Sequence, residues 1–204
     1  MSFFSHVIVP RLCDFLLNKS LLVRHRRGLL ACAYGDVVEI GFGTGLNLPY
    51  YLDRVDKLTA VDPNPGMHRL AQKRIRQRGI EVDQHVLGGE RLPFEDGHFD
   101  CAVSTFTLCS IEDVAQAVRE VYRVLKPGGK FLFLEHGLSP EPGVQKWQRR
   151  LNGLQVRLAN GCHLDRDIKA LVAAQPFASV EVEEFYLERT PKTHGYMYRG
   201  TATK

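Results

Sequence analysis

A short apolar run that ends in closely spaced glycines is the feature that most restricts the fold of this chain. Residues Val37 to Ile40 read as a buried strand, and Gly41, Gly43 and Gly45 follow it at alternate positions. Glycine adopts left-handed backbone conformations at little cost and leaves space for a ligand to approach the backbone. A strand that runs directly into such a loop is typical of open parallel sheets, which bind ligands at the carboxyl ends of their strands.

The remaining segments alternate between strand-like and helix-like patterns. Besides residues 37–40, strands are predicted at residues 58–61, 82–86, 99–105, 130–134, 180–185 and 196–203. Helices are predicted at residues 46–52, 64–77, 112–125, 144–158 and 165–174, the last with Asp165 as its N-cap. Helices between strands indicate a mainly parallel sheet covered on both faces, and the two final strands, joined by a loop, add one antiparallel strand. We therefore predict an α/β, three-layer Rossmann-like fold with a seven-stranded sheet.

The length and composition fit one domain. The chain has 204 residues, of which 44% are hydrophobic and 25% charged, and no linker or low-complexity tract interrupts it. We expect a single domain over residues 1–204, with an N-terminal helical lid at 1–34 and a core at 35–204. The net charge of +4 does not by itself argue for a nucleic-acid partner. We interpret the basic cluster at residues 24–27 as a solvated helix face.

The cysteines and the apolar segments bear on the setting of the protein. Five cysteines, at positions 13, 32, 101, 109 and 162, form no Cys-x-x-Cys pair. We therefore expect neither a disulfide framework nor a zinc site, and a reducing, cytoplasmic setting fits. No apolar run reaches about 18 residues, so no membrane-spanning helix is expected. Ile8, Leu12, Phe15 and Leu16 stand at helical spacing, which fits either a lid helix or a helix on a membrane surface.

The residues around the glycine loop restrict the ligand. The spacing is G-x-G-x-G with Leu46 next, so the dinucleotide fingerprint G-x-G-x-x-G is not met. Glu39 stands just before the first glycine, where a carboxylate would repel a pyrophosphate and would suit a cationic ligand. Asp62 follows the second predicted strand, where its carboxylate can accept both hydroxyls of a ribose. The alternative role for Asp62 is that of a helix cap before Pro63.

With these residues in place, the chain resembles the class I S-adenosylmethionine-dependent methyltransferases of the ubiquinone/menaquinone-methylase type. The matching motifs fall within residues 36–135, at 39–45, 62, 92–94, 99–100 and 123–129. A narrower resemblance links it to the mammalian microsomal thiol S-methyltransferases and their bacterial relatives. The segments that carry it are 62–65, 89–90, 108–110, 135–136, 161–166 and 195–196. The mammalian enzymes have an apolar N-terminal anchor, whereas this chain begins with an amphipathic segment, so the expected membrane contact is peripheral.

The resemblance implies transfer of a methyl group from S-adenosylmethionine to a small-molecule acceptor, apolar or a thiol. It assigns the methionine part of the cofactor to the glycine loop, the ribose to Asp62, and the adenine to the loop after the third strand. The expected cofactor-binding residues are Glu39, Gly41, Gly43, Gly45, Asn47, Asp62, Pro63, Met67, Gly89, Glu90, Leu92 and Thr105.

The acceptor side of the site is less defined by the sequence. His136, at the end of the fifth predicted strand, is the candidate general base, with a purely structural histidine as the alternative. Candidate residues of the acceptor pocket are Phe15, Cys109, Trp147 and His163. Cys109 is interpreted as a small apolar residue, and both aromatic residues have a core position as their alternative.

Other functions stay open at this point. A quinol or a lipid can replace the thiol as the acceptor. A nicotinamide-dependent oxidoreductase would need a different glycine spacing, and a cofactor-binding protein without catalysis would keep the same loop. A nucleic-acid methylase is not expected, because residues 105–108 lack the proline-aromatic motif that acts on base amino groups.

Overall fold

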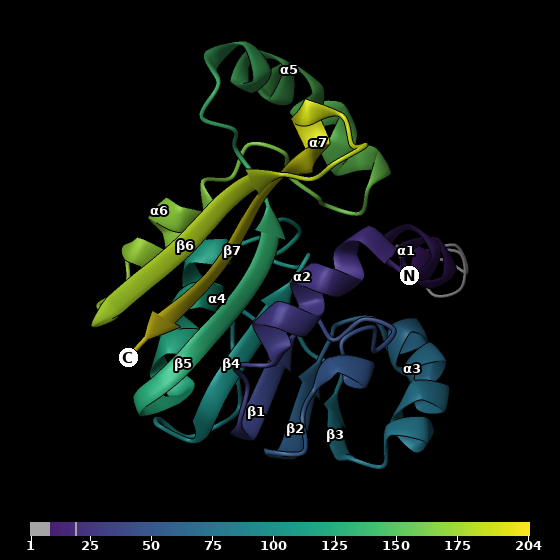
Figure 1. The fold of residues 1–204 in the computed structure, drawn as a ribbon, viewed down its shortest axis with the longest axis vertical. Helices are drawn as coiled ribbons and strands as arrows, with labels where there is room; N and C mark the ends of the chain where they lie inside the picture. Colours follow the sequence, from purple (N-terminus) through teal and green to yellow (C-terminus); the bar gives the residue numbers. More distant parts are fainter. Residues whose placement is uncertain (1–8, 19) are drawn as a thin grey trace.

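Seven strands form one mixed sheet in the order β3-β2-β1-β4-β5-β7-β6, with helices against both faces (Figure 1). The computed structural model describes residues 9–18 and 20–204. The strands are β1 (Gly35–Ile40), β2 (Val55–Val61), β3 (Glu81–His85), β4 (Phe99–Thr105), β5 (Leu125–His136), β6 (Ser179–Tyr186) and β7 (Tyr196–Thr203). β7 runs antiparallel to both of its neighbours, and the other observed pairings are parallel. The predicted seven-stranded, mainly parallel sheet with one antiparallel strand is confirmed.

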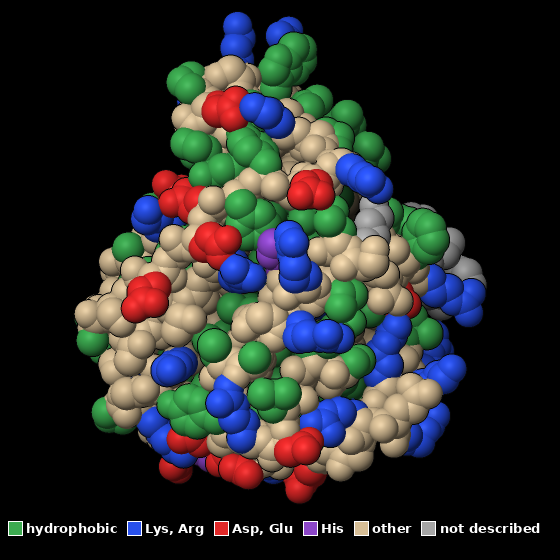
Figure 2. All heavy atoms as spheres, viewed as in Figure 1, with side chains coloured by type: hydrophobic (Ala, Val, Ile, Leu, Met, Phe, Trp, Pro, Cys, Tyr) green, Lys and Arg blue, Asp and Glu red, His purple; other side chains and the backbone are tan. Residues whose placement is uncertain are grey.

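Helices precede β1 in sequence and also lie in the connections between strands. They are α1 (Val9–Leu17), α2 (Ser20–Leu30), the 3-10 turn η2 (Leu48–Tyr50), α3 (Pro65–Arg78), α4 (Val114–Val124), α5 (Pro142–Leu158), α6 (Ile168–Ala173) and α7 (Lys192–Gly195). α5 and α7 contact each other beyond the carboxyl end of β5, at the top of Figure 1, where hydrophobic and basic side chains lie at the surface (Figure 2). The strand order reverses between β1 and β4, which is where an open α/β sheet forms its ligand crevice.

The period of two along each strand divides the core into two layers. In β5, Phe131 and Phe133 pack with α4 and α6 on one face, whereas Leu132 and Leu134 point to the other face. That second face is covered by α2, η2 and α3. The central strands are therefore buried on both sides, which explains their nearly continuous apolar sequences.

The two described helices of the predicted N-terminal lid, α1 and α2, have different surroundings. Residues 1–8 and 19 of the predicted lid, which include Ile8, lie outside the described residues. α2 packs its Leu29 and Leu30 into the core against β5 and belongs to the helical layer. α1 contacts α3 beside the carboxyl ends of the strands, and it is the part of the predicted lid that reaches the ligand crevice.

Two local predictions were wrong. The helix predicted at residues 46–52 is the short turn η2, because Tyr51 turns to an extended conformation and the chain enters β2. The helix predicted from Asp165 begins at Ile168, and Asp167 is its N-cap, accepting a hydrogen bond from Ala170 N at 2.9 Å. The second error concerns a helix end, where a polar side chain two positions away offers an equally plausible start.

Candidate functional site

A cavity of about 380 Å³ opens at the carboxyl ends of the central strands, where the strand order reverses. Its walls are the loops that follow β1, β2, β3 and β4, at residues 41–47, 62–64, 87–90 and 106–112. Cys13 and Leu17 of α1 close one side, and Ala159 and Asn160 after α5 close another. The volume lies in the range of small-molecule sites, so the cavity suits a ligand the size of a nucleoside derivative.

The three glycines after β1 share a left-handed backbone but have different surroundings. Their φ angles are +73° at Gly41, +58° at Gly43 and +76° at Gly45. A Cβ at Gly41 would overlap the side chain of Thr107, and one at Gly45 would lie 2.9 Å from Leu48 Cδ1. A Cβ at Gly43 would meet no atom closer than 3.8 Å, and Gly43 lines the cavity. Gly43 alone of the three therefore leaves its backbone open to a ligand, while the other two allow close packing.

Asp62 lies at the end of β2 and is buried on the cavity wall. Its Oδ2 accepts a hydrogen bond from Gly43 N at 2.9 Å, and its Oδ1 accepts one from Asn64 N at 2.8 Å. Burial raises the pKa of Asp62, and the two backbone N–H groups act in the opposite direction. The N-cap of α3 is Asn64, which accepts from Gly66 N, so the structure does not support the capping role considered for Asp62.

Glu39 lies under the glycine loop in a buried network. Its Oε1 accepts a hydrogen bond from Asn47 Nδ2 at 2.8 Å, and its Oε2 accepts one from the Tyr51 hydroxyl at 2.7 Å. Burial raises the pKa of Glu39 to about 7, although the hydrogen bonds from Tyr51 and Asn47 lower it. Glu39 is therefore poised between its neutral and ionised forms near neutral pH, and a cation in the cavity would favour the ionised form.

Arg26 completes this network, and the interpretation of residues 24–27 as a solvated helix face was wrong for it. Arg26 is 4% exposed, lines the cavity, and its Nη1 donates to Asn47 Oδ1 at 2.5 Å and to Thr105 Oγ1 at 3.0 Å. Its guanidinium also lies over the ring of Phe106, 5.4 Å from the centroid. The neighbouring His25 is buried as well. Leu22, Leu29 and Leu30 stand at helical spacing from Arg26, so the sequence did contain a signal for its burial.

The loop after β4 is held in a strained conformation at the cavity wall. Phe106 has a φ of +56°, which is unfavourable for a residue with a Cβ. Glu135 of β5 is fully buried and accepts hydrogen bonds from Ser104 Oγ at 2.7 Å and Thr107 N at 2.9 Å. This carboxylate fixes the loop from inside the sheet, so that Phe106 and Thr107 face the cavity.

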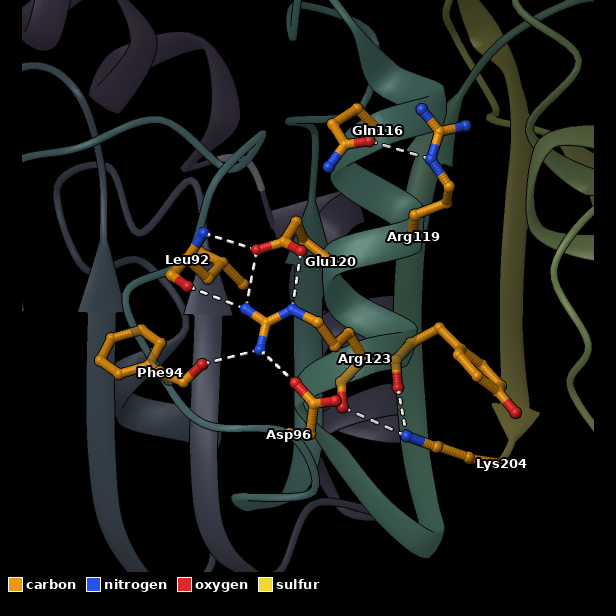
Figure 3. A network of polar contacts seen from close by, with 9 residues as sticks. Leu92, Phe94, Asp96, Gln116, Arg119, Glu120, Arg123 and Lys204 are labelled. Carbon is orange, nitrogen blue, oxygen red and sulfur yellow. Dashed lines mark hydrogen bonds and ion pairs between the residues drawn. The ribbon is translucent and has the colours of Figure 1, made fainter.

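The loop after β3 is anchored by two charged residues of α4 (Figure 3). Glu120 accepts a hydrogen bond from Leu92 N at 2.8 Å, and Arg123 donates to Leu92 O at 2.9 Å and Phe94 O at 2.8 Å. Arg123 also forms ion pairs with Glu120 and Asp96. Leu92 packs in the core beneath this network and does not line the cavity, whereas Gly89 and Glu90 do.

The structure brings most of the predicted cofactor-binding residues to one cavity. Those on its wall are Glu39, Gly41, Gly43, Asn47, Asp62, Pro63, Met67, Gly89, Glu90 and Thr105. Gly45 and Leu92 do not line it, because both are used in packing beneath the loops. Leu87 and Ile111, which sequence reasoning missed, supply apolar surface near Gly89.

The predicted acceptor residues are not on the wall of this cavity. Phe15 and Trp147 are 76% and 55% exposed, since they point outward from α1 and α5. His163 faces Asn152, with 3.2 Å between Nδ1 and Nδ2. Cys109 and His136 lie outside the lining residues too, and His136 Nε2 is 3.1 Å from Cys162 Sγ. The structure instead places Cys13, Leu17, Ser110 and Asn160 beside the cavity.

Comparison with known proteins agrees with this fold. Residues 38–133 match a family described as "Methyltransferase domain". The chain is 34% identical over 152 residues to thiol S-methyltransferase TMT1B of Rattus norvegicus, covering 72% of this chain and 62% of that protein. It is 30% identical over 139 residues to the ubiquinone/menaquinone biosynthesis C-methyltransferase UbiE of Shewanella woodyi, covering 66% of this chain and 55% of that protein.

A solved structure has the same architecture. Geranyl diphosphate methyltransferase in complex with S-adenosylmethionine superposes with a TM-score of 0.68 at 16% identity, over 89% of this chain and 84% of that one. This chain spans less than two thirds of the length of the thiol S-methyltransferases it matches. The family match covers β1 to β5, the strands whose loops form most of the cavity. The chain therefore belongs to the S-adenosylmethionine-dependent methyltransferases.

Proposed function

We propose that this chain transfers a methyl group from S-adenosylmethionine to a small acceptor, and that the acceptor is a thiol. The observation that carries the first part is a pair of buried carboxylates, Glu39 and Asp62, that line the same cavity as the open backbone of Gly43. Neither carboxylate forms an ion pair with a residue in the described part of the chain. A cationic amino acid joined to a nucleoside would satisfy both of them.

We assign the amino-acid end of the cofactor to Glu39 and Gly43, the ribose to Asp62, and the adenine to Gly89 and Glu90. When bound, the cofactor would supply a methyl group carried on a sulfonium: the acceptor forms a bond to the methyl carbon, the carbon–sulfur bond breaks, and the sulfur leaves as a neutral thioether. Because the leaving group is neutral, no residue of the chain has to protonate it. The contribution of the chain is to position the acceptor and to exclude water, for which α1 lies beside the cavity.

Two observations support a thiol acceptor. Four curated relatives, each 32–34% identical to this chain over 151 or 152 residues, are named thiol S-methyltransferases. In addition, no histidine lies among the described residues that line the cavity, and a thiol is the acceptor that needs a base least, because its pKa is about 8.5. A phenol or an amine would need a general base within hydrogen-bond reach.

A screen with S-adenosylmethionine labelled in its methyl group tests the proposal. The screen should include small thiols, quinols, amines and lipids, with label transferred to the thiols as the expected result. Transfer to quinols or lipids with none to thiols would reject the thiol and support the acceptor class of the UbiE relative. Label in none of them, from a chain that binds the cofactor, would contradict methyl transfer to a small acceptor.

Methylation of a thiol should become faster as the pH approaches the pKa of that thiol. The thiolate is the nucleophile, and the cavity offers no histidine among its described lining residues to generate it. Initial rates with two thiols of different pKa, measured at saturating cofactor, should rise along two displaced curves. If the two curves coincide, the rate follows the titration of a group of the protein and not that of the thiol, which would contradict this prediction.

Replacing Asp62 with alanine should weaken S-adenosylmethionine binding by about 1–3 kcal/mol, the usual loss for charge-assisted hydrogen bonds. The change also leaves Gly43 N and Asn64 N without their acceptor, so unfolding should be measured beside the calorimetric titration. Asp53→Ala is the matched control, because Asp53 is an exposed residue paired with Arg78. If the Asp62 variant and the control bind S-adenosylmethionine with equal affinity, Asp62 does not contact the cofactor.

We also propose a peripheral membrane contact through α1. Within the described residues, no helix is both long enough and apolar enough to cross a bilayer. Leu12, Phe15 and Leu16 nevertheless project from α1 with 45–76% of their surface exposed, beside the opening of the cavity. Phe15→Ser should reduce cosedimentation with phospholipid vesicles, and Leu52→Ser, at an exposed leucine far from α1 in sequence, should leave it unchanged. Equal cosedimentation of both variants would exclude α1 as the contact.

A further inference from the structure

Three side chains that suit a soft metal ion meet beside the cavity, although each comes from a different part of the sequence. Cys109 follows β4, His136 ends β5, and Cys162 lies in the turn after α5. One ligand atom from each, Sγ, an imidazole nitrogen and Sγ, lies within 4.8 Å of the other two. His136 Nε2 and Cys162 Sγ are 3.1 Å apart.

The backbone positions of all three residues are fixed by hydrogen bonds. Cys109 O accepts from His163 N at 2.8 Å, which ties the turn after α5 to the loop after β4. Cys162 N donates to Ala159 O at 3.1 Å, and His136 is the last residue of β5 to pair with β7. The side chains therefore converge on rigid supports, and a metal ion would not have to organise the chain around itself.

The geometry points to a zinc site formed by Cys109, His136 and Cys162, and we propose that this chain binds one Zn²⁺ there. Two thiolates and one imidazole are a common set of zinc ligands. Ligand atoms at about 2.3 Å (sulfur) and about 2.0 Å (nitrogen) from a tetrahedral ion lie about 3.5–3.8 Å from one another. The observed separations, up to 4.8 Å, need a movement of about 1 Å, which rotation of the side chains supplies.

The surroundings fit a metal ion as well. Gln155 Nε2 donates to Cys162 Sγ at 3.6 Å, as an outer hydrogen bond to a metal thiolate would. Two thiolates balance the charge of Zn²⁺, so the half-buried site needs no further anion. Three protein ligands leave a fourth coordination position free for water or a substrate atom.

The site adjoins the cofactor cavity. The hydroxyl of Ser110, a residue on the cavity wall, lies 3.5 Å from Cys109 Sγ. Ala159, whose carbonyl accepts a hydrogen bond from Cys162 N, also lines the cavity. The zinc ion would therefore lie just behind the wall that Ser110 and Ala159 form. His136, as a ligand, would not act as the general base that the sequence predicted.

Cobalt substitution tests the site without relying on methyl transfer. The full chain, reduced and stripped of metal with a chelator that is then removed, is titrated with Co²⁺ and afterwards with Zn²⁺. We expect one Co²⁺ per chain, with thiolate-to-cobalt charge-transfer absorption in the near ultraviolet and the strong visible bands of a tetrahedral site. Zn²⁺ should displace it and abolish both.

Matched variants identify the ligands. Cys162→Ser and His136→Gln should each weaken Zn²⁺ binding by more than about 100-fold, because loss of an outer-shell partner alone costs about 10- to 100-fold. Cys32→Ser, which removes an exposed thiol elsewhere, should leave the affinity unchanged. Circular dichroism and calorimetric binding of S-adenosylmethionine verify that each variant is folded.

Three results would overturn the proposal. The first is a folded, reduced chain that shows no charge-transfer absorption with Co²⁺. The second is absorption that persists in Cys162→Ser. The third is a chain isolated without metal and with a Cys109–Cys162 disulfide, which would make the pair a redox couple. Each of these outcomes is independent of whether the chain methylates thiols.

Discussion

Replacing Glu39 with glutamine is expected to weaken S-adenosylmethionine binding by about 2–5 kcal/mol above about pH 8, the usual loss when one member of a buried charge pair is removed. The carboxylate lies on the cavity wall, is buried, and holds only neutral donors, Asn47 and Tyr51. Arg26 reaches this carboxylate only through Asn47, so no direct ion pair neutralises its charge, and the ammonium or sulfonium of the cofactor can pair with it. Glutamine keeps the shape of the side chain, but it removes the negative charge and replaces one of the two acceptor oxygens with an NH2 donor, so either Asn47 or Tyr51 loses its acceptor.

The same variant should abolish a pH dependence of binding. Because burial raises the pKa of Glu39 to about 7, the free chain must release a proton to bind a cation at lower pH. Affinity should therefore fall by up to about tenfold for each pH unit below 7. The variant has no such proton to release and should show a flat profile over this range.

The stability of the free chain should change in the opposite direction. A glutamate whose pKa rises from its ordinary 4.5 to about 7 on folding stabilises the folded state below pH 4.5 and loses this contribution as the pH rises to about 7. The loss amounts to about 3 kcal/mol. Relative to the unaltered chain, Glu39→Gln should therefore gain stability over this interval.

Calorimetric titration and urea unfolding at several pH values measure both effects. Glu95→Gln, at an exposed position in the loop before β4, is the control and should follow the unaltered chain in both. A Glu39 variant with unchanged affinity and an unchanged pH profile would show that Glu39 has a structural role only.

Replacing Gly41 with alanine is expected to destabilise the free chain by about 2–4 kcal/mol. The backbone there has a φ of +73°, which costs a residue with a Cβ about 1 kcal/mol or more. The new methyl group would also overlap Thr107, whose N–H is bonded to the buried Glu135, and such overpacking costs about 1–3 kcal/mol. The two penalties fall on the same loop and add.

Two further glycines separate these causes in urea unfolding. At Gly43 the backbone is also left-handed, but a Cβ there would overlap no neighbouring atom. Gly43→Ala should therefore lower the stability of the chain by about 1 kcal/mol and mainly weaken cofactor binding. Gly153→Ala, in the middle of α5 with open space around it, should change stability by at most about 1 kcal/mol, in the stabilising direction. If Gly41→Ala is no less stable than Gly43→Ala, the packing of Thr107 against Gly41 is not as described.

The sequence was sufficient for the features that local pattern determines. Gly41 and Gly43 follow an apolar run, and Asp62 ends the next one, so a parallel sheet places them at the same edge. The antiparallel direction of β7 was predictable, because only a short connection separates this strand from β6. In these cases the spacing of a few residues is enough to predict the strand and its loop, and the topology of the sheet determines where the loop lies.

Features that depend on tertiary packing were not predictable in the same way. The apolar spacing of Leu22, Leu29 and Leu30 around Arg26 indicated a buried face of α2, but only the packed structure shows that the guanidinium reaches Asn47 and Thr105. Phe15 and Trp147 looked like pocket walls, yet they lie on the outer faces of their helices. Cys109, His136 and Cys162 meet only through the order of β4, β5 and the turn after α5, which no spacing rule captures.

The most direct test of the central claim is a calorimetric titration of the purified, folded chain with S-adenosylmethionine at about pH 8, where Glu39 is ionised. The account predicts saturable binding of one molecule per chain, weakened in Asp62→Ala and Glu39→Gln, and no binding of NADH. Binding of NADH, or a folded chain that gives no heat with S-adenosylmethionine, would contradict it.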